Sequence, residues 1–440
     1  MMPELPGATG GEFPGPCYRF APAVPPGAAA PAGAATLPGA GAPAAPGASR
    51  WRVLHGDLLL PVVVLRESAL LHNARVMADY CRDSGVSLAP HAKTHMSPEL
   101  AALQVDSGAW GLTVANAAQA RVFHAFGFRR LLIANQVVDE QALRWMAAAL
   151  RGDPELEVYC LVDSEAGTAI MDKALAAAGA VRPVPVLVEL GYPGGRSGCR
   201  SLREAADVAA AVRGKHRLRL AGVECYEGSR GGTPDEATLA GVDALLGQVR
   251  DLAGQLDRAG CFGGCEEIIV SAGGSAFFDR VVSVLTPPPD LSRPVRTVLR
   301  SGSYLSHDHG AYQTLSPFGT RLPDRPRLRP ACELWARVTS RPEPGLAILG
   351  FGKRDCPYDL GLPVPLTVVK PDGASRPAAG EVVRLNDQHA YLRTGAADDL
   401  AVGDLISLGM SHPCTTFDKW RVMPVVDDDY QVIRMVRTFF

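Results

Sequence analysis

Two short segments of this 440-residue chain combine side chains that are suited to chemistry. The first is Pro90-His91-Ala92-Lys93-Thr94-His95, in which a lysine lies between two histidines after the apolar run 86–89. An activated lysine amine can form a Schiff base with a carbonyl group, and histidine can transfer protons near neutral pH. A solvated basic turn has the same composition, so this segment alone leaves both interpretations open.

The second segment contains His412 and Cys414, which are separated by one residue. In an extended segment, side chains two positions apart point to the same side. The pair would then present an imidazole and a thiolate together, which suits zinc. Two protein ligands leave room for water or substrate, as a Lewis-acid metal requires. The alternative is a buried cysteine beside a hydrogen-bonded histidine.

The composition excludes several classes of protein. Hydrophobic residues make up 47% and charged residues 20% of the chain, which predicts a mostly globular protein. A formal net charge of -2 argues against nucleic acid or an anionic membrane as the main partner. No apolar run approaches the ~18 residues that a membrane span needs. The N-terminus lacks a signal-peptide pattern, because two acidic residues precede the first arginine, and we expect a cytoplasmic protein.

The chain divides into three stretches of different texture. Residues 1–50 are rich in Pro, Ala and Gly and are predicted to be mostly disordered. Residues 51–320 alternate amphipathic helical segments with eight apolar strand candidates, at 86–90, 111–115, 130–134, 156–162, 184–190, 220–226, 267–271 and 297–300. Eight such units predict an α/β fold, a (β/α)8 TIM-type barrel with a parallel sheet.

Residues 321–440 show no further helical periodicity. Their short apolar runs, bounded by Pro and Gly, predict a C-terminal antiparallel β domain that carries the His412–Cys414 pair. The apolar run near 59–65, or residues around 20, could add a strand to this domain.

In such a barrel, functional side chains gather at the C-terminal ends of the strands. The loops after strands seven and eight contain Ser271 with Gly273-Gly274-Ser275, and Gly302-Ser303-Tyr304. Glycine turns expose backbone N–H groups, so the two loops together predict a phosphate site, although each alone is also an ordinary turn. A phosphate opposite the strand-one lysine indicates pyridoxal phosphate. Arg196 and Tyr226, after strands five and six, would lie near its ring.

With these residues assembled, the sequence resembles the D-serine dehydratase/D-threonine aldolase family of fold-type III pyridoxal phosphate enzymes, and more distantly alanine racemase. The similar segments are 90–95, 108–115, 132–136, 195–198, 226–228, 273–275 and 302–304, with His389 and 412–414 in the C-terminal part. One departure is Glu227, which stands where the family usually has histidine in a Tyr-His-Gly segment. The resemblance covers roughly residues 55–436.

The resemblance implies a role for each site residue. Lys93 and His95 would be catalytic, and His412 and Cys414 would bind a divalent metal such as zinc. Asn135 and Gln136 would bind substrate. The cofactor-binding set is Lys93, His91, Arg196, Tyr226, Ser271, Gly273, Gly274, Ser275, Gly302, Ser303 and Tyr304.

The implied function is that of a pyridoxal phosphate- and metal-dependent lyase acting on D-3-hydroxy amino acids. Cys414 favours a D-serine dehydratase-like elimination to a keto acid and ammonia, because aldolases of this family have aspartate at that place. The runner-up is D-threonine aldolase-type cleavage to glycine and an aldehyde. A non-catalytic pyridoxal phosphate-binding protein is the alternative of another class. The architecture also implies a homodimer.

Overall fold

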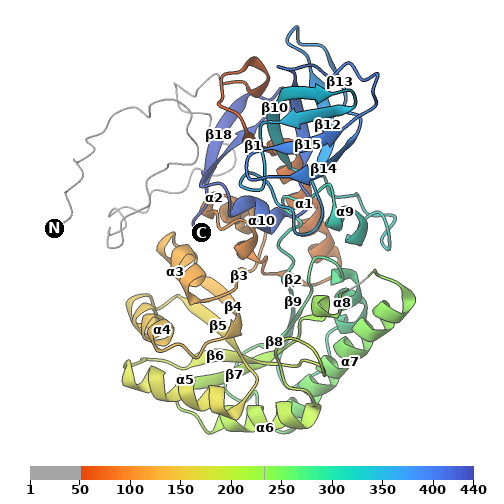
Figure 1. Ribbon diagram of the computed structural model, residues 1–440. Coiled ribbons are helices and arrows are strands. Elements are labelled where there is room, and N and C mark those ends of the chain that lie inside the picture. The colour runs from red at the N-terminus through yellow and green to blue at the C-terminus, as the bar shows by residue number, and fades with distance from the viewer. Residues whose placement is uncertain (1–50, 232) are drawn as a thin grey trace, which may run out of the picture.

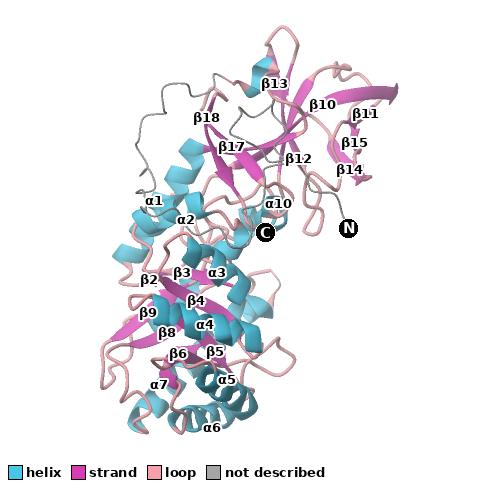
Figure 2. Cartoon of the chain, turned by 90° about the vertical axis from the view of Figure 1, so that its left-hand side faces the viewer, coloured by secondary structure: helices cyan, strands magenta, loops and turns pink. Residues whose placement is uncertain are grey.

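The computed structural model describes residues 51–231 and 233–440, so the N-terminal stretch predicted to be disordered lies outside the described residues. The chain folds into a barrel of parallel strands with a β domain above it (Figure 1). A view from the side shows the barrel strands in a layer below the β domain (Figure 2).

All eight strands expected in the barrel are present. They are β2 (Ser87–Leu88), β3 (Leu112–Val114), β4 (Arg130–Gln136), β5 (Glu157–Val162), β6 (Val184–Glu189), β7 (Leu218–Glu224), β8 (Ile268–Ala272) and β9 (Val295–Leu299). The sheet order β2-β9-β8-β7-β6-β5-β4-β3 follows the chain around a ring, and every pairing in it is parallel. Each residue of β6 is buried, as expected for a strand covered on both faces.

The ring closes between β2 and β3 next to the lysine segment. His91 and Thr113 form a parallel bridge, and the amide of Thr113 donates to the carbonyl of Pro90 at 2.9 Å. The centre of the barrel is filled by side chains that point inward from successive strands: Ala89, Leu132, Tyr159, Leu161, Leu187, Ala221, Ile269 and Val298. The barrel is therefore a packed core whose upper mouth is available for chemistry.

Helices cover the outside of the barrel. They are α2 (Pro98–Asp106), α3 (Ala117–Ala125), α4 (Glu140–Gly152), α5 (Glu165–Ala177), α6 (Leu202–Arg213), α7 (Glu236–Arg258) and α8 (Phe278–Leu285), and α1 (Glu67–Asp83) precedes β2. Six of them start at a side chain that accepts a backbone N–H of the first turn: Ser97, Asn116, Asp139, Ser164, Ser201 and Asp235. Such caps each stabilise a helix by ~1 kcal/mol.

The β domain is a mixed, mostly antiparallel sheet. Its strands are β1 (Val62–Arg66), β10 (Cys332–Glu343), β11 (Leu346–Leu349), β12 (Val364–Val369), β13 (Ser375–Pro377), β14 (Glu381–Leu385), β15 (Ala390–Arg393), β16 (Leu405–Gly409), β17 (Val422–Val426) and β18 (Val432–Arg437). The apolar run near 59–65 does join this sheet, because β1 pairs antiparallel with β10 and parallel with β17. The long strand β10 connects the two halves of the sheet.

Two short helices follow the last barrel strand, and the second lies within the stretch 321–440, in which no helical periodicity was found. They are α9 (Ala311–Leu315) and α10 (Pro413–Phe417), and the second contains Cys414. Both are one to two turns long, too short to show a periodicity in the sequence. α10 packs against the 3-10 turn η2 (Ala92–Thr94) and so joins the β domain to the barrel mouth. Within the described ranges, no helix has the length and apolarity needed to cross a membrane.

Candidate active site

Lys93 lies in η2, directly after the first barrel strand, and its side chain is exposed at the barrel mouth. The surrounding protein partly desolvates the amine and lowers the pKa of Lys93; the charges of Arg196 and Arg300 act in the same direction, and Cys414 opposes them. A lysine with a lowered pKa carries more neutral amine at neutral pH, which is the form that attacks a carbonyl or takes up a proton.

The two histidines that flank the lysine lie in different surroundings. The Nδ1 atom of His91 is buried and has no hydrogen-bond partner among the described residues. Burial, and then the charge of Lys93, lower the pKa of His91 well below its usual value. His95 is buried as well, but its Nε2 lies 3.1 Å from Oε1 of Gln104 and its Nδ1 accepts the amide of Ser97 at 3.0 Å. Burial lowers the pKa of His95 to about 4, so the ring is neutral and both of its nitrogens are engaged.

The two glycine turns lie side by side at the ends of β8 and β9. The hydroxyl oxygens of Ser275 and Ser303 are 2.7 Å apart, and this contact joins the turns. Gly302 packs so closely on the lysine segment that a Cβ atom there would lie 2.3 Å from the carbonyl oxygen of His91. Tyr304 is buried in the core just beyond the second turn.

Glu227 has a position that the sequence did not indicate. The residue is fully buried, and its carboxylate accepts the amides of Gly273 at 3.0 Å and Gly274 at 2.5 Å. The N–H groups that were expected to face a phosphate therefore point at a side chain of the chain itself.

Arg196 and Tyr226 contact each other at the mouth. The Arg196 guanidinium carbon lies 5.0 Å from the centre of the Tyr226 ring, within the range of a cation–π contact. The β6–α6 loop that carries Arg196 is held by Arg200, which donates to carbonyl oxygens of the loop, including Ser197 at 2.6 Å and Gly195 at 2.9 Å. A small pocket is lined by Glu189, Leu190, Gly191, Tyr192, Arg196, Ser197, Tyr226 and Ser229.

A buried charge cluster below the mouth was missed by the sequence analysis. Arg300 donates to Oγ of Ser271 at 2.6 Å and to the carbonyl of Cys225 at 2.8 Å, and it forms a 2.8 Å ion pair with Glu224. Burial raises the pKa of Glu224 to about 8, although the charge of Arg300 opposes this shift. Ser271 thus contacts Arg300 directly. The only sequence signal for Arg300 was its place at the end of strand eight.

Asn135 and Gln136 lie at the end of β4. Gln136 donates to Glu189 at 2.5 Å, which brings it to the same rim as the small pocket. Asn135 is exposed and donates to the carbonyl of Ala115 at 3.2 Å.

The His412–Cys414 pair is brought to the barrel mouth by α10. His412 is the N-cap of α10 and Cys414 lies inside the helix, so the segment is not extended as expected. Their side chains still meet: burial alone would raise the pKa of Cys414, but hydrogen bonds from His412 and Thr94 lower it. Despite burial, hydrogen bonds to Cys414 and Asp359 raise the pKa of His412 to about 9.

Asp359 is a further residue of this cluster that the sequence did not reveal. Its Oδ2 lies 2.6 Å from Nδ1 of His412, and its Oδ1 accepts the hydroxyl of Thr415 at 2.9 Å. A carboxylate that binds one ring nitrogen of a histidine leaves the other nitrogen, Nε2, to a metal. In the described part of the chain, no group of three or more His, Cys, Asp or Glu side chains forms a ready metal site.

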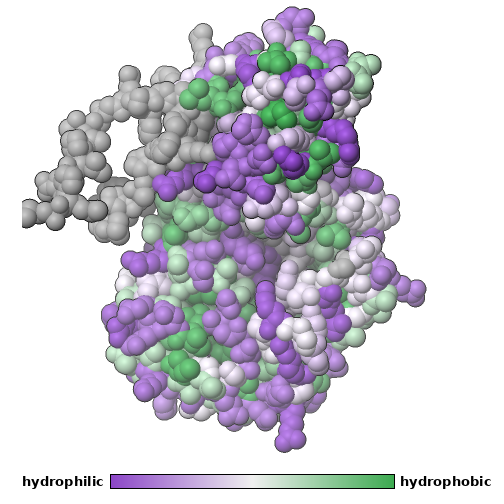
Figure 3. Space-filling view, in the orientation of Figure 1, coloured by the Kyte–Doolittle hydropathy of each residue, from purple (hydrophilic) through white to green (hydrophobic). Residues whose placement is uncertain are grey.

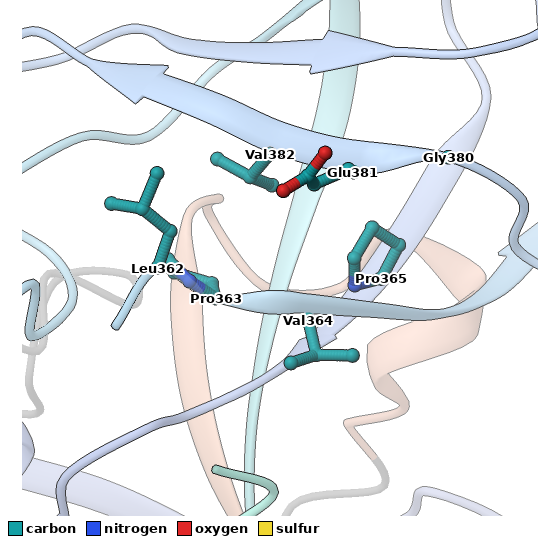
Figure 4. A pocket seen from close by; sticks show the side chains of 7 residues that line it. All are labelled: Leu362, Pro363, Val364, Pro365, Gly380, Glu381 and Val382. Atoms are coloured by element: carbon teal, nitrogen blue, oxygen red, sulfur yellow. The ribbon is translucent and has the colours of Figure 1, made fainter. Parts of the chain in front are cut away.

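The mouth of the barrel faces the β domain, and hydrophilic side chains gather around the hollow between the barrel and the β domain (Figure 3). A pocket of about 290 Å3 lies elsewhere, between the segments Leu362–Pro365 and Gly380–Val382 of the β domain (Figure 4). Its lining is largely apolar and contains none of the predicted site residues. We therefore place the candidate site at the barrel mouth, where the reactive groups converge.

Two family models match the chain, one for each body. Residues 65–281 match the alanine racemase N-terminal domain, and residues 331–426 match the "Putative serine dehydratase domain". The first range contains Lys93, and the second contains His412 and Cys414. The chain thus combines an alanine racemase N-terminal domain with a serine dehydratase domain, and it is a fold-type III pyridoxal phosphate enzyme related to D-threonine aldolase and D-threo-3-hydroxyaspartate dehydratase. The resemblance inferred from the motifs is confirmed.

Individual members of this family match across both bodies. A D-threonine aldolase from Arthrobacter sp is 28% identical over 373 residues, which are 84% of this chain and 89% of that protein. The crystal structure of D-threonine aldolase from Filomicrobium marinum has a TM-score of 0.71 and 27% identity, and covers 87% of this chain and 95% of that one. D-threo-3-hydroxyaspartate dehydratase from Delftia sp. HT23 has a TM-score of 0.68 and 22% identity, with 87% and 98% covered. The two named reactions differ, so the fold is what these proteins share with the chain.

The residues at the mouth fit the cofactor of the dehydratase/aldolase family. Lys93 provides an exposed amine of lowered pKa, and the unpartnered Nδ1 of His91 is a buried polar atom beside it. The hydroxyls of Ser275 and Ser303 can both donate to a phosphate. The donor set of His412 and Cys414 likewise fits a divalent metal with open coordination positions.

Proposed function

We propose that this protein is a pyridoxal phosphate- and metal-dependent lyase that eliminates water from D-3-hydroxy amino acids. Loss of water and hydrolysis of the resulting enamine give a keto acid and ammonia, which is pyruvate if the substrate is D-serine. The observation that supports this most directly is the meeting of the two segments: Oγ1 of Thr94, next to Lys93, lies 3.5 Å from Sγ of Cys414.

The residues of the mouth have separate roles in this reaction. When bound, the cofactor supplies an electron sink for charge at Cα, and the metal supplies a Lewis acid for the β-hydroxyl. Nζ of Lys93 takes up the Cα proton, since its lowered pKa makes the neutral amine available. Arg196 stacks on Tyr226 at the rim of the mouth, where both would contact the cofactor. Its positive charge also helps to lower the pKa of Lys93.

His412 and Cys414 hold the metal in this proposal, and Asp359 orients His412. The lowered pKa of Cys414 favours the thiolate, which is the form that binds metals. Solved variants of the related dehydratase replace a histidine and a cysteine two positions apart by alanine, and the cysteine variant is described as metal-free. Those names support a metal role for the equivalent spacing here.

The resemblance implied a catalytic role for His95, and the contacts of its ring favour a supporting one. We assign it to supporting the lysine turn, because both ring nitrogens are bound within the protein and the ring packs edge-on against Phe417 of α10. His91, whose Nδ1 is free of protein partners in the described residues, is the histidine that faces the cofactor.

Retro-aldol cleavage is the second candidate. Two of the relatives that match both bodies are named D-threonine aldolases. That reaction would use the same residues, Lys93 with the metal held by His412 and Cys414. The β-hydroxyl would lose its proton, the Cα–Cβ bond would break, and glycine and an aldehyde would be released.

The test is to incubate the purified protein with D-serine, D-threonine, D-3-hydroxyaspartate and their L-isomers. Keto acid with ammonia, and glycine with aldehyde, are measured separately, with and without a chelator. We expect keto acid from at least one D-isomer, and its loss with the chelator. Predominant glycine would replace elimination by the aldolase reaction. Bound cofactor without turnover of any substrate would favour the non-catalytic alternative.

A further inference from the structure

The Gly273-Gly274 turn is held from two sides by side chains of the chain itself. On one side, the two oxygens of Glu227 accept the amides of Gly273 and Gly274 at 3.0 and 2.5 Å. On the other side, the hydroxyl of Ser301 contacts the carbonyl oxygens of the same two residues at 3.0 and 3.2 Å, and the amide of Arg300 donates to Gly273 at 3.2 Å. Each backbone polar group of the two glycines therefore has a partner within the protein.

The backbone conformation of the turn depends on glycine. Gly273 has a φ of 104°, a region that L side chains rarely adopt. The ring of Tyr226 packs against the turn, and its Cε2 atom lies 3.1 Å from the place that a Cβ atom on Gly274 would occupy. A shift of this turn would thus move both Tyr226 and the neighbouring Ser275.

A phosphate that used the two glycine amides would have to displace the Glu227 carboxylate. Glu227 is fully buried. Expelling a buried carboxylate from two charge-assisted hydrogen bonds is costly, and a dianion in its place would gain the same two bonds at most. We therefore expect the amides of Gly273 and Gly274 to stay bound to Glu227 when a phosphate is present.

The hydroxyls of Ser275 and Ser303 remain for an anion. They come from the two different turns and lie 2.7 Å apart, and either can donate. Ser303 is almost fully buried and Ser275 is half-buried, so the pair opens on one side only.

We propose that Glu227 is a positioning residue of the phosphate site. It fills the Gly273-Gly274 amide cradle from inside and locks the turn so that Ser275 faces Ser303. The phosphate of the cofactor is then bound by these hydroxyls and not by the two glycine amides. This inference rests on the proposed function only through the identity of the cofactor.

The experiment compares two probes that differ in the phosphate alone. Cofactor-free protein is titrated with pyridoxal 5'-phosphate and with pyridoxal, and the two dissociation constants are obtained from the absorbance of the lysine-bound form. The variants are Glu227→Gln, which places an NH2 group against one of the two amides, and Ser303→Ala. Glu333→Gln is the control, because Glu333 is a buried carboxylate of the β domain that is bound to Tyr430.

The expected result is a loss of preference for the phosphorylated probe. Glu227→Gln should bind pyridoxal 5'-phosphate about tenfold more weakly while its affinity for pyridoxal changes little. Ser303→Ala should show the same pattern, and Glu333→Gln should lose thermal stability with an unchanged ratio of the two constants. If Glu227→Gln binds the phosphorylated probe more tightly, Glu227 competes with the phosphate and the inference is overturned.

Two further outcomes also decide against it. Equal weakening of both probes in Glu227→Gln would show a merely structural role. If Glu227→Gln does not fold, Ser303→Ala decides, and an unchanged preference in that variant overturns the assignment of the phosphate to the serine pair. Failure of the proposed function looks different, since the unaltered protein would then bind neither probe, or bind both without turnover of any amino acid.

Discussion

Oγ1 of Thr94 lies 3.5 Å from Sγ of Cys414, although 320 positions separate the two residues in the chain. The contact joins the turn that follows the first barrel strand to the short helix α10 of the β domain. Because Thr94 follows Lys93 and Cys414 lies two positions after His412, the contact brings the lysine amine and the two proposed metal ligands to one barrel mouth.

Replacing Lys93 by alanine should abolish the visible absorbance of bound cofactor and all turnover, because the substitution removes the amine proposed to form the Schiff base and to take up the Cα proton. Absorbance spectra after addition of pyridoxal 5'-phosphate measure the first effect, and keto acid formation the second. Lys173→Ala, on the outer surface of α5, is the matched control and should behave like the unaltered protein. Turnover by the Lys93 variant would refute the assignment of the base.

Cys414→Ala should lose bound metal and elimination while the cofactor absorbance stays. The reason is that the thiolate is one of only two proposed metal ligands, whereas Lys93 is untouched. Elemental analysis of the dialysed protein measures the metal. Cys265→Ala, at a buried cysteine away from the mouth, should keep its metal. Elimination by metal-free Cys414→Ala protein would show that the metal role is wrong.

Asp359→Asn should weaken metal binding about tenfold to a hundredfold, since the carboxylate 2.6 Å from Nδ1 orients the imidazole of His412. Competition with a chromogenic chelator gives the metal dissociation constant. Asp418→Asn removes a nearby exposed carboxylate that does not contact His412, and it should leave the constant unchanged. Equal effects of the two substitutions would point to general electrostatics instead of orientation.

His95 should make the fold sensitive to acid. Its folded pKa of about 4 lies below the unfolded value of 6.5, so the unfolded chain binds more protons between these two pH values. The stability contribution is complete above pH 6.5 and is lost as the pH falls toward 4; it amounts to ~3 kcal/mol at most. Free energies of unfolding at pH 7.5 and pH 5 measure it.

His307 and His309 are shifted in the same direction, so His95→Gln should flatten only part of this dependence. The same variant separates the two roles of His95. A supporting role predicts lower stability with the pH profile of turnover retained, whereas loss of one limb of that profile would restore the catalytic role.

Much of the barrel follows from local sequence. The eight strands were found because each is a continuous apolar run, and such runs alternate with alanine-rich helical segments such as 139–150. Lys93 and the two glycine turns were recognisable because a barrel places the ends of all its strands at one mouth. The His412–Cys414 pair was visible through residue type and spacing alone.

Only the tertiary structure decided how these segments meet. β1 precedes the barrel in the sequence but pairs with β10 and β17 of the C-terminal domain. No local sequence pattern specifies these partners. The roles of Asp359 and Glu227 depend on contacts over 53 and 46 positions, which a single sequence does not display. Side-chain chemistry is a local property, but its use depends on long-range packing, and for this reason the sequence determined the reactive groups while the fold determined their partners.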